Sequence, residues 1–199
     1  MRLYTHPSSA NAHKAKLLLG FLGLPHDELV IDIPGGEQRE PAFLAVSALG
    51  QIPVLEDGAA RIRDAQAILV YLAGRYDPER LWWPQDPVGQ GLIAQWLAFA
   101  AVELQNGVNL ARLHFRLGAP CDLAAAQAQG EKTLRLLDAR LSGRDWLELD
   151  RPTIADLACV TFPARAGEAG HDLARCPAVS AWVERVRARP GFLGMEGYA

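Results

Sequence analysis

The chain has 199 residues, of which 50% are hydrophobic and 22% are charged, a composition typical of a globular protein with a core of its own. Its net charge of −3 and the lack of a basic run argue against nucleic acid or an anionic membrane as the main partner. No apolar stretch reaches the roughly 20 residues of a membrane-spanning helix, and the first residues lack the apolar core of a signal peptide. We therefore expect a cytoplasmic protein whose partner is a small molecule or another protein.

Hydrophobic periodicity and turn residues predict alternating strands and helices in the first part of the chain. Gly23 is a C-terminal helix signal, whereas Pro41 and Asp64 are typical of helix starts. In chain order, the expected elements are a strand at 3–4, a helix at 11–22, a strand at 28–33, a helix at 41–46, a hairpin at 54–55 and 60–63, and a helix at 65–76.

The stretch from Gly50 to Gly58 organises this first part. A proline cannot donate to a sheet ladder, so Pro53 belongs at a strand entrance, and X-Pro bonds are where cis peptides occur in folded proteins. A cis bond here would leave the backbone N–H and C=O of Ile52 outside the ladder. Such free groups are what a binding site for another peptide needs.

A break in composition separates this part from the rest. Residues 77–87 contain three prolines and follow no helical period, so the domain boundary is placed there. We expect Trp82 and Trp83 to pack this linker between two domains. Beyond it, helical patterns cover 93–108, 123–141, 153–164 and 179–186, and no strand pattern is found.

The cysteines and histidines give no sign of a metal or disulfide framework. Cys121, Cys159 and Cys176 are odd in number, widely spaced and absent from the first 120 residues. The five histidines show no metal-ligand spacing. We therefore expect no metal, and three thiols in a reducing compartment.

Several local motifs occur in a specific order along the chain. They are Leu3-Tyr4, Ser9 to Lys14, Gly50 to Leu55, Asp64 to Ile68 with Tyr71-Leu72, Pro152 to Asp156, and Pro190 to Phe192. In the fifth, Thr153 and Asp156 form a capping-box variant, whose most direct role is to start a helix. Together the motifs resemble the cytosolic glutathione transferase superfamily over essentially the whole chain. The likeness is to its serine-type members, in the theta-like and beta-like bacterial branch.

The resemblance implies an α/β thioredoxin-like N-terminal domain and an all-α C-terminal helical domain. On this sequence the domains are residues 1–77 and 88–199, with a linker at 78–87. Family members typically form homodimers that bind glutathione, their co-substrate, in the N-terminal domain. They hold an apolar second substrate against the helical domain, so we expect a homodimer here.

The resemblance places a thiolate-stabilising hydroxyl after the first strand, where this chain has Ser9. Lowering a thiol pKa from about 8.5 by two units takes roughly 2.7 kcal/mol, and one charge-assisted hydrogen bond supplies about 1.5 to 3 kcal/mol. Ser8, Asn11 and Tyr4 remain alternatives, as does a role for Ser9 as a helix cap alone. Because no cysteine is near, disulfide-exchange chemistry through a protein thiol is not expected.

The resemblance also assigns contacts to glutathione. The Ile52 backbone, beside Pro53, pairs with the cysteinyl part, and Gln51 or Gln38 holds the glycyl carboxylate. The γ-glutamyl carboxylate lies at the N-terminus of the helix that begins at Asp64, which binds the amine. The family usually has serine after this acid, whereas this chain has Ala65. The lost hydroxyl weakens binding by about ten- to a hundredfold unless water or a neighbour replaces it.

The co-substrate cleft has no sequence motif. Phe99, Glu103 and Asn106 share one face of the first long helix, with Arg112 and His114 near its end. They are candidates to line the cleft, and a solvated polar face is an equally good interpretation.

The function that these residues favour is a glutathione transferase that conjugates the thiolate to a small apolar electrophile, for example in detoxification. A non-catalytic binding or assembly module of the same fold is the alternative that Ala65 favours. Glutathione-dependent peroxidase, isomerase or dehalogenase activity also remains open, because the sequence does not separate these reactions.

Overall fold

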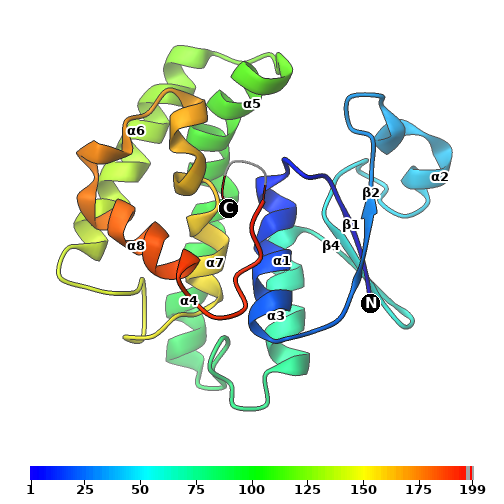
Figure 1. Ribbon diagram of the computed structural model, residues 1–199, viewed down its shortest axis with the longest axis horizontal. Helices are drawn as coiled ribbons and strands as arrows, with labels where there is room; N and C mark the ends of the chain where they lie inside the picture. Colours follow the sequence, from blue (N-terminus) through cyan, green and yellow to red (C-terminus); the bar gives the residue numbers. More distant parts are fainter. Residues whose placement is uncertain (196–197, 199) are drawn as a thin grey trace.

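The computed structural model describes residues 1–195 and Tyr198, and the first part of the chain forms a four-stranded sheet (Figure 1). Its strands are β1 (Arg2–Thr5), β2 (Asp27–Val30), β3 (Val54–Asp57) and β4 (Ala60–Arg63). They lie in the order β2-β1-β3-β4, with β1 parallel to β2 and antiparallel to β3. This mixed sheet confirms the thioredoxin-like α/β prediction.

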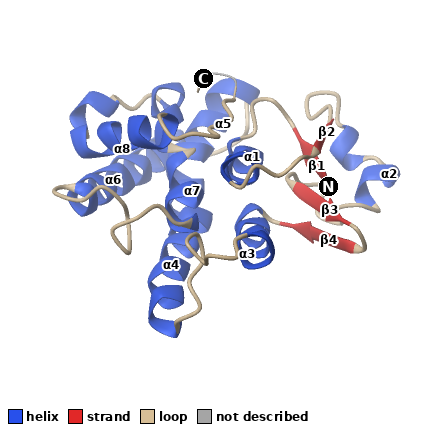
Figure 2. Cartoon of the chain, turned by 60° about the horizontal axis from the view of Figure 1, so that its bottom comes forward, coloured by secondary structure: helices blue, strands red, loops and turns tan. Residues whose placement is uncertain are grey.

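Helices cover both faces of the sheet: α1 (Ala10–Phe21) and α3 (Ala65–Tyr76) on one face, and η1 (Glu37–Arg39) and α2 (Pro41–Leu44) on the other (Figure 2). Alternate strand residues face opposite ways. Leu3 and Leu55 therefore join the main core with α1 and α3, while Val54 packs with Phe43 of α2 in a smaller cluster.

The second strand is shorter than the expected 28–33. Its pairing with β1 ends at Val30, and the chain then turns. The Asp32 amide donates to Glu37 at 2.7 Å, and an Asp32 carboxylate oxygen accepts from the Gly35 amide at 2.8 Å. These side-chain bonds compete with the sheet ladder, as Asp commonly does at turns.

The rest of the described chain is helical, which confirms the predicted all-α second part. Its elements are α4 (Pro87–Phe99), the π-helical η2 (Ala100–Asn109), α5 (Leu110–Leu117), α6 (Leu123–Leu141), α7 (Ile154–Val160), the 3₁₀ segments η3 (Pro163–Ala169) and η4 (Leu173–Arg175), and α8 (Pro177–Arg187). Beyond residue 87, the described residues contain one isolated β-bridge, between Met195 and Tyr198, and no strand. No helix in the described part is long and apolar enough to span a membrane.

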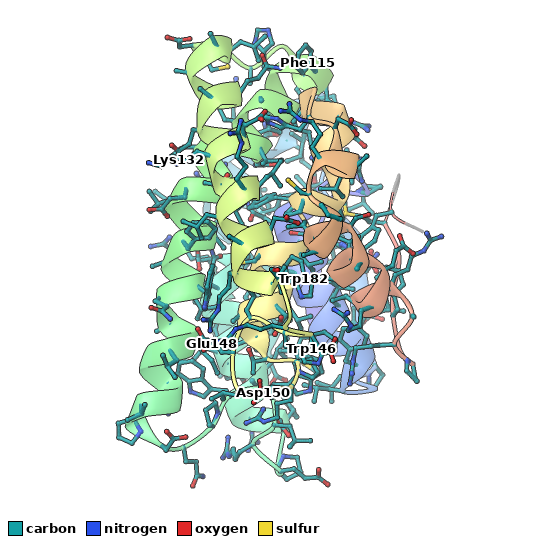
Figure 3. All side chains as sticks on the ribbon, turned by 90° about the vertical axis from the view of Figure 1, so that its left-hand side faces the viewer. Phe115, Lys132, Trp146, Glu148, Asp150 and Trp182 are labelled. Atoms are coloured by element: carbon teal, nitrogen blue, oxygen red, sulfur yellow. The ribbon has the colours of Figure 1, made fainter. Side chains whose placement is uncertain are left out.

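The helix expected at 153–164 ends at Val160, because Pro163 cannot continue it and the chain tightens into η3. Its start is as predicted, with Thr153 and Asp156 forming the capping box. Asp156 is fully buried and also accepts from the Leu147 amide at 3.1 Å and from the indole of Trp182, labelled in Figure 3, at 3.0 Å. The motif therefore joins α7 to α8 as well as starting a helix.

The segment between the two parts packs against both, as expected of its tryptophans. Trp82 stacks on Phe21 of α1 with ring centroids 5.4 Å apart, and its carbonyl accepts from the Ile154 amide of α7 at 3.1 Å. The boundaries at residues 77 and 88 stay a prediction.

Lys14, on α1, is fully buried where α1 meets the helical part. Its ammonium lies 4.0 Å from the centroid of the Phe162 ring, and among the described residues it has no hydrogen-bond partner. Burial lowers the pKa of Lys14 from its ordinary 10.5 to about 7. The fold therefore carries a charge that the interface does not compensate fully.

We predict that Lys14→Met stabilises the protein at pH 7 by about 1 to 4 kcal/mol, because it removes this burial penalty. Between the folded pKa near 7 and the ordinary value, the unfolded state binds more protons, so the stability of the unchanged protein rises with pH in this window. Below this pH window, the free-energy cost of burying the charged Lys14 does not change with pH. Chemical unfolding between about pH 7 and pH 8.5 measures both effects.

The matched control is Lys16→Met. Lys16 is on the same helix, but its ammonium pairs with Glu28 at 2.8 Å near the surface. Its loss is expected to change stability by about 1 kcal/mol or less, without altering the pH slope. A destabilised Lys14→Met variant with an unchanged slope would contradict the prediction.

Candidate functional site

A cavity of about 460 Å³ lies between the sheet part and the helical part. The residues assigned from the sequence to the thiolate and to glutathione all line it: Ser9, Gln38, Gln51, Ile52, Pro53, Asp64 and Ala65. The opposite wall comes from η2 and α5: Ala101, Gln105, Asn109, Arg112, Leu113, Arg116 and Leu117. The fold thus brings the assigned residues together, while their roles in binding stay predictions.

Ser9 is the N-cap of α1, and its hydroxyl oxygen accepts from the Ala12 amide at 3.1 Å. A hydroxyl has one hydrogen to donate and two lone pairs to accept with. Capping uses a lone pair and leaves the hydrogen for a ligand in the cavity. The two roles considered for Ser9, helix cap and thiolate donor, are therefore compatible.

The hydroxyls of Ser8 and Tyr4, the alternatives to Ser9, already donate hydrogen bonds to other side chains. The Ser8 amide donates to Nδ1 of His6 at 3.2 Å, which makes Nδ1 an acceptor, so the Ser8 hydroxyl at 2.9 Å donates to it as well. The Tyr4 hydroxyl donates to Glu56 at 3.2 Å. Burial and this carboxylate raise the pKa of Tyr4. Among the hydroxyls of Tyr4, Ser8 and Ser9, that of Ser9 is therefore the best placed donor.

Asn11 also lines the cavity, but its amide donates to Gln105 of η2 at 3.2 Å. This hydrogen bond connects α1 to the helical part across the cavity. Asn11 retains one further N–H, so it stays a secondary candidate.

The Gly50 to Pro53 segment is held in place by two hydrogen bonds to one side chain, that of Ser47. Its Ile52-Pro53 bond is cis, and Ile52 lies outside the strand pairing, which begins at Val54. The buried Ser47 hydroxyl donates to the Gln51 carbonyl at 2.9 Å and accepts from the Gln51 amide at 3.3 Å. Sequence reasoning missed Ser47, because nothing local marks a serine as a brace for a residue four positions later.

Gly50 explains how Gln38 reaches the same cavity. Gly50 has a φ of 61°, and a Cβ there would lie 2.7 Å from the Gln38 carbonyl. Only glycine allows this close approach. The amide oxygen of Gln38 is buried without a partner among the described residues, so it is free to accept from a ligand.

Asp64 starts α3 with a φ of 77°, which is unusual for a residue other than glycine and is typical of functional sites. Its carboxylate accepts from the amides of Gln66 at 2.9 Å and Ala67 at 3.0 Å. Among the described residues, the Ala65 amide is left without a partner at this helix N-terminus. An anion in the cavity can accept from this amide.

Phe99, Glu103 and Asn106, the expected cleft residues, do not line this cavity. The α-helical period that grouped them fails because η2 is π-helical: the Leu110 amide bonds to the Gln105 carbonyl five residues back. Because a π-helical turn is wider than an α-helical turn, side chains four positions apart share the face toward the cavity. Ala101, Gln105, Asn109, Leu113 and Leu117 follow this spacing at the cavity, and Arg112 and Arg116 line it beside them.

Arg112 reaches the cavity, as the sequence allowed, whereas His114 does not. The Arg112 side chain is 2% exposed. Its Nη2 donates to the Ser8 carbonyl at 2.9 Å, and its Nε donates to Glu168 at 2.8 Å. α5 lies above the start of α1 in Figure 1, which is why this contact forms. Glu168 also pairs with the buried Arg165, with Nη2 and Oε1 2.5 Å apart.

No three His, Cys, Asp or Glu side chains gather as metal ligands within the described ranges, and no cysteine lines the cavity. What the geometry provides is a pocket with hydrogen-bond donors at two helix N-termini, a buried guanidinium and a few apolar side chains on the opposite wall. Such a pocket suits a small anionic or thiolate ligand.

Comparison with protein families gives two matches. The model of the glutathione S-transferase N-terminal domain matches residues 3–80, and that of the glutathione S-transferase C-terminal domain matches residues 100–190.

Among curated proteins, the chain is 31% identical to glutathione S-transferase F10 of Arabidopsis thaliana, covering 94% of this chain and 92% of the relative. It is 29% identical to human glutathione S-transferase theta-1, covering 84% and 74% of the two chains. It is also 30% identical to the disulfide-bond oxidoreductase YfcG of Escherichia coli, covering 94% and 90%.

Solved structures agree with these matches. A glutathione S-transferase from Pseudomonas fluorescens is 32% identical, covers 98% of both chains and superposes with a TM-score of 0.88. Ure2p in complex with glutathione is 27% identical, with a TM-score of 0.87 over 96% of this chain and 95% of that one. This chain belongs to the cytosolic glutathione transferase superfamily.

Proposed function

We propose that this protein is a glutathione transferase that binds glutathione in the cavity and conjugates it to a small electrophile. The observation that carries the proposal is the position of Ser9, whose hydroxyl caps α1 and keeps its hydrogen for the cavity. A thiolate there is also favoured by the positive end of the α1 dipole.

In the proposed reaction, the thiol of bound glutathione loses its proton to solvent and Ser9 donates a hydrogen bond to the thiolate. The sulfur then attacks the electrophile, forming a carbon–sulfur bond while the leaving group departs with its electron pair. The Ala65 amide holds the γ-glutamyl carboxylate, and Asp64 its amine. Ile52 pairs with the cysteinyl backbone, and Gln38 and Gln51 lie near the glycyl end.

Leu113 and Leu117 support an electrophile with an apolar part, since both line the cavity from α5 and Leu117 is 52% exposed. A detoxifying role in the cytoplasm belongs to the same proposal.

A second candidate reaction is glutathione-dependent disulfide reduction, favoured by the likeness to YfcG. Because no cysteine among the described residues lines the cavity, that reaction would use glutathione thiols alone. An exchange assay with a small disulfide distinguishes it from conjugation.

A homodimer is part of the proposal. Val88, Leu92 and Val102 expose apolar side chains along α4 and η2, at 73%, 36% and 53%, and Leu49 is 58% exposed. Exposed apolar side chains that recur along one helical run are candidates for an interface with another protein. A second copy of the chain is the partner we propose for them.

Removing the Ser9 hydroxyl tests the catalytic role. Ser9→Ala is expected to lower kcat/KM for conjugation by about ten- to a hundredfold and to raise the thiol pKa of bound glutathione. Steady-state rates and the ultraviolet absorbance of the thiolate measure the two effects. Ser9→Thr keeps the hydroxyl and should restore most activity, and Ser8→Ala should matter less. Full turnover in Ser9→Ala would refute the assignment.

Restoring the hydroxyl at position 65 tests the glutathione site. Ala65→Ser is expected to tighten glutathione binding by about ten- to a hundredfold, because it adds a hydrogen bond to a charged carboxylate. Isothermal calorimetry measures the change. Ala67→Ser is the matched control, since Ala67 is in the first turn of α3 but outside the cavity lining. No binding to either the unchanged protein or Ala65→Ser at about 10 mM would favour a non-catalytic module.

Charging the exposed apolar surface tests the dimer. A Val88→Glu, Val102→Glu double variant is expected to be a monomer in sedimentation velocity where the unchanged protein is a dimer, because a buried unpaired carboxylate is costly. Leu136→Glu, at a 45% exposed residue of α6, should leave the dimer intact. A monomer already in the unchanged protein would remove this part of the proposal.

A further inference from the structure

Arg112 is an unusual residue for a pocket wall meant for an apolar co-substrate. The side chain is 2% exposed, so its charge is largely removed from water. Nε and Nη2 are used by Glu168 and the Ser8 carbonyl. Among the described residues Nη1 has no partner, and Arg112 lines the cavity. One arm of a buried guanidinium is therefore left for whatever occupies the cavity.

Among the described residues, several guanidinium groups around Arg112 share one carboxylate, that of Glu168. Arg112 and Arg165 both pair with Glu168, at 2.8 Å and 2.5 Å, which sets two positive charges against one negative charge. Arg116 pairs with the same carboxylate at 3.2 Å. Burial alone would raise the pKa of Glu168, but the neighbouring guanidinium groups lower it, so Glu168 is ionised and already shared. Because Glu168 is shared in this way, the carboxylate does not belong to Arg112 alone, and Nη1 of Arg112 can still pair with a ligand anion.

Arg112 is close to the position proposed for the sulfur. Nη2 contacts the carbonyl of Ser8, the residue before Ser9. The glutathione carboxylates have other proposed partners, at the Ala65 amide and at Gln38 and Gln51, on the sheet part of the cavity. The anion that meets Arg112 therefore comes from the second substrate.

We propose that the co-substrate of this enzyme carries a carboxylate, which Arg112 binds while the thiolate attacks an adjacent electrophilic carbon. The inference rests on the proposed transferase function and narrows its substrate class. Asn109 and Gln105 line the same wall, and Asn109 donates to Gln105 at 3.1 Å. Leu113 and Leu117 contact the apolar body of the substrate. The substrate is thus an amphiphilic acid rather than a purely apolar molecule.

The test compares two electrophiles that differ in one charge: a chloronitrobenzoate and its methyl ester. In both, the thiolate sulfur forms a bond to the ring carbon that carries chlorine, and chloride leaves with the bonding electron pair. The glutathione proton goes to solvent. The acid is expected to have a kcat/KM about ten- to a hundredfold above that of the ester, each corrected for its uncatalysed rate.

The decisive variant is Arg112→Gln. The quantity to compare is the ratio of kcat/KM for the acid to kcat/KM for the ester. The ratio is expected to fall to about one, whereas Arg112→Lys keeps part of it because the charge remains. Any displacement of Ser9 in Arg112→Gln slows both substrates alike, so the ratio isolates the charge. Arg165→Gln is the matched control: it removes a charge from the same Glu168 but lies outside the cavity lining, so the ratio should stay within about twofold.

Equal rates for acid and ester in the unchanged protein would overturn the inference and leave the transferase function standing. An equal fall of both rates in Arg112→Gln would also overturn it and would make Arg112 a positioning residue for Ser9. If neither compound is conjugated, the transferase proposal fails. Calorimetry with the two ready-made glutathione conjugates then decides the inference, which requires tighter binding of the acid and loss of that preference in Arg112→Gln.

Discussion

Burial of α1 on nearly every side is the constraint on which the rest of this structure depends. The helix packs against α3 within the sheet part and against α7 in the helical part, and the C-terminal segment runs beside it (Figure 1). A surface helix would leave its basic residues in water. Here His13 and Lys14 are buried, and burial lowers their pKa values to about 4 and about 7. The fixed position of α1 sets the place of Ser9.

The same packing brings positive groups to the cavity in a protein of net charge −3. The N-termini of α1 and α3 both open into it, and each contributes a partial positive charge. Arg112 adds a guanidinium group from α5, which is paired on its other side with Glu168. Overall charge argues against nucleic acid as a partner but is silent about a small anion, because a local field depends on which few groups the fold brings together.

Sequence rules were sufficient where the placement of a residue depends on its neighbours in the chain. The turn chemistry of Ile52-Pro53, the cap at Asp64 and the serine at the first helix start are local signals, and the fold brings all three to one cavity. The rules failed where geometry is set from a distance. Ser47 braces Gln51 only after the loop has folded, and the π-helical turn in η2 has no signature in hydrophobic spacing.

The two halves of the site therefore obey different constraints. The half proposed for glutathione is built from short motifs, each close together in the chain. The half proposed for the co-substrate comes from one continuous helical run, in which a shift of one residue turns a side chain by about 100° around the helix axis. Such a shift in η2 would take Arg112 out of the cavity and bring another residue in. In this fold, a rotation of the helix about its axis can thus change which side chains meet the second substrate, while the residues proposed to surround the thiolate stay as they are.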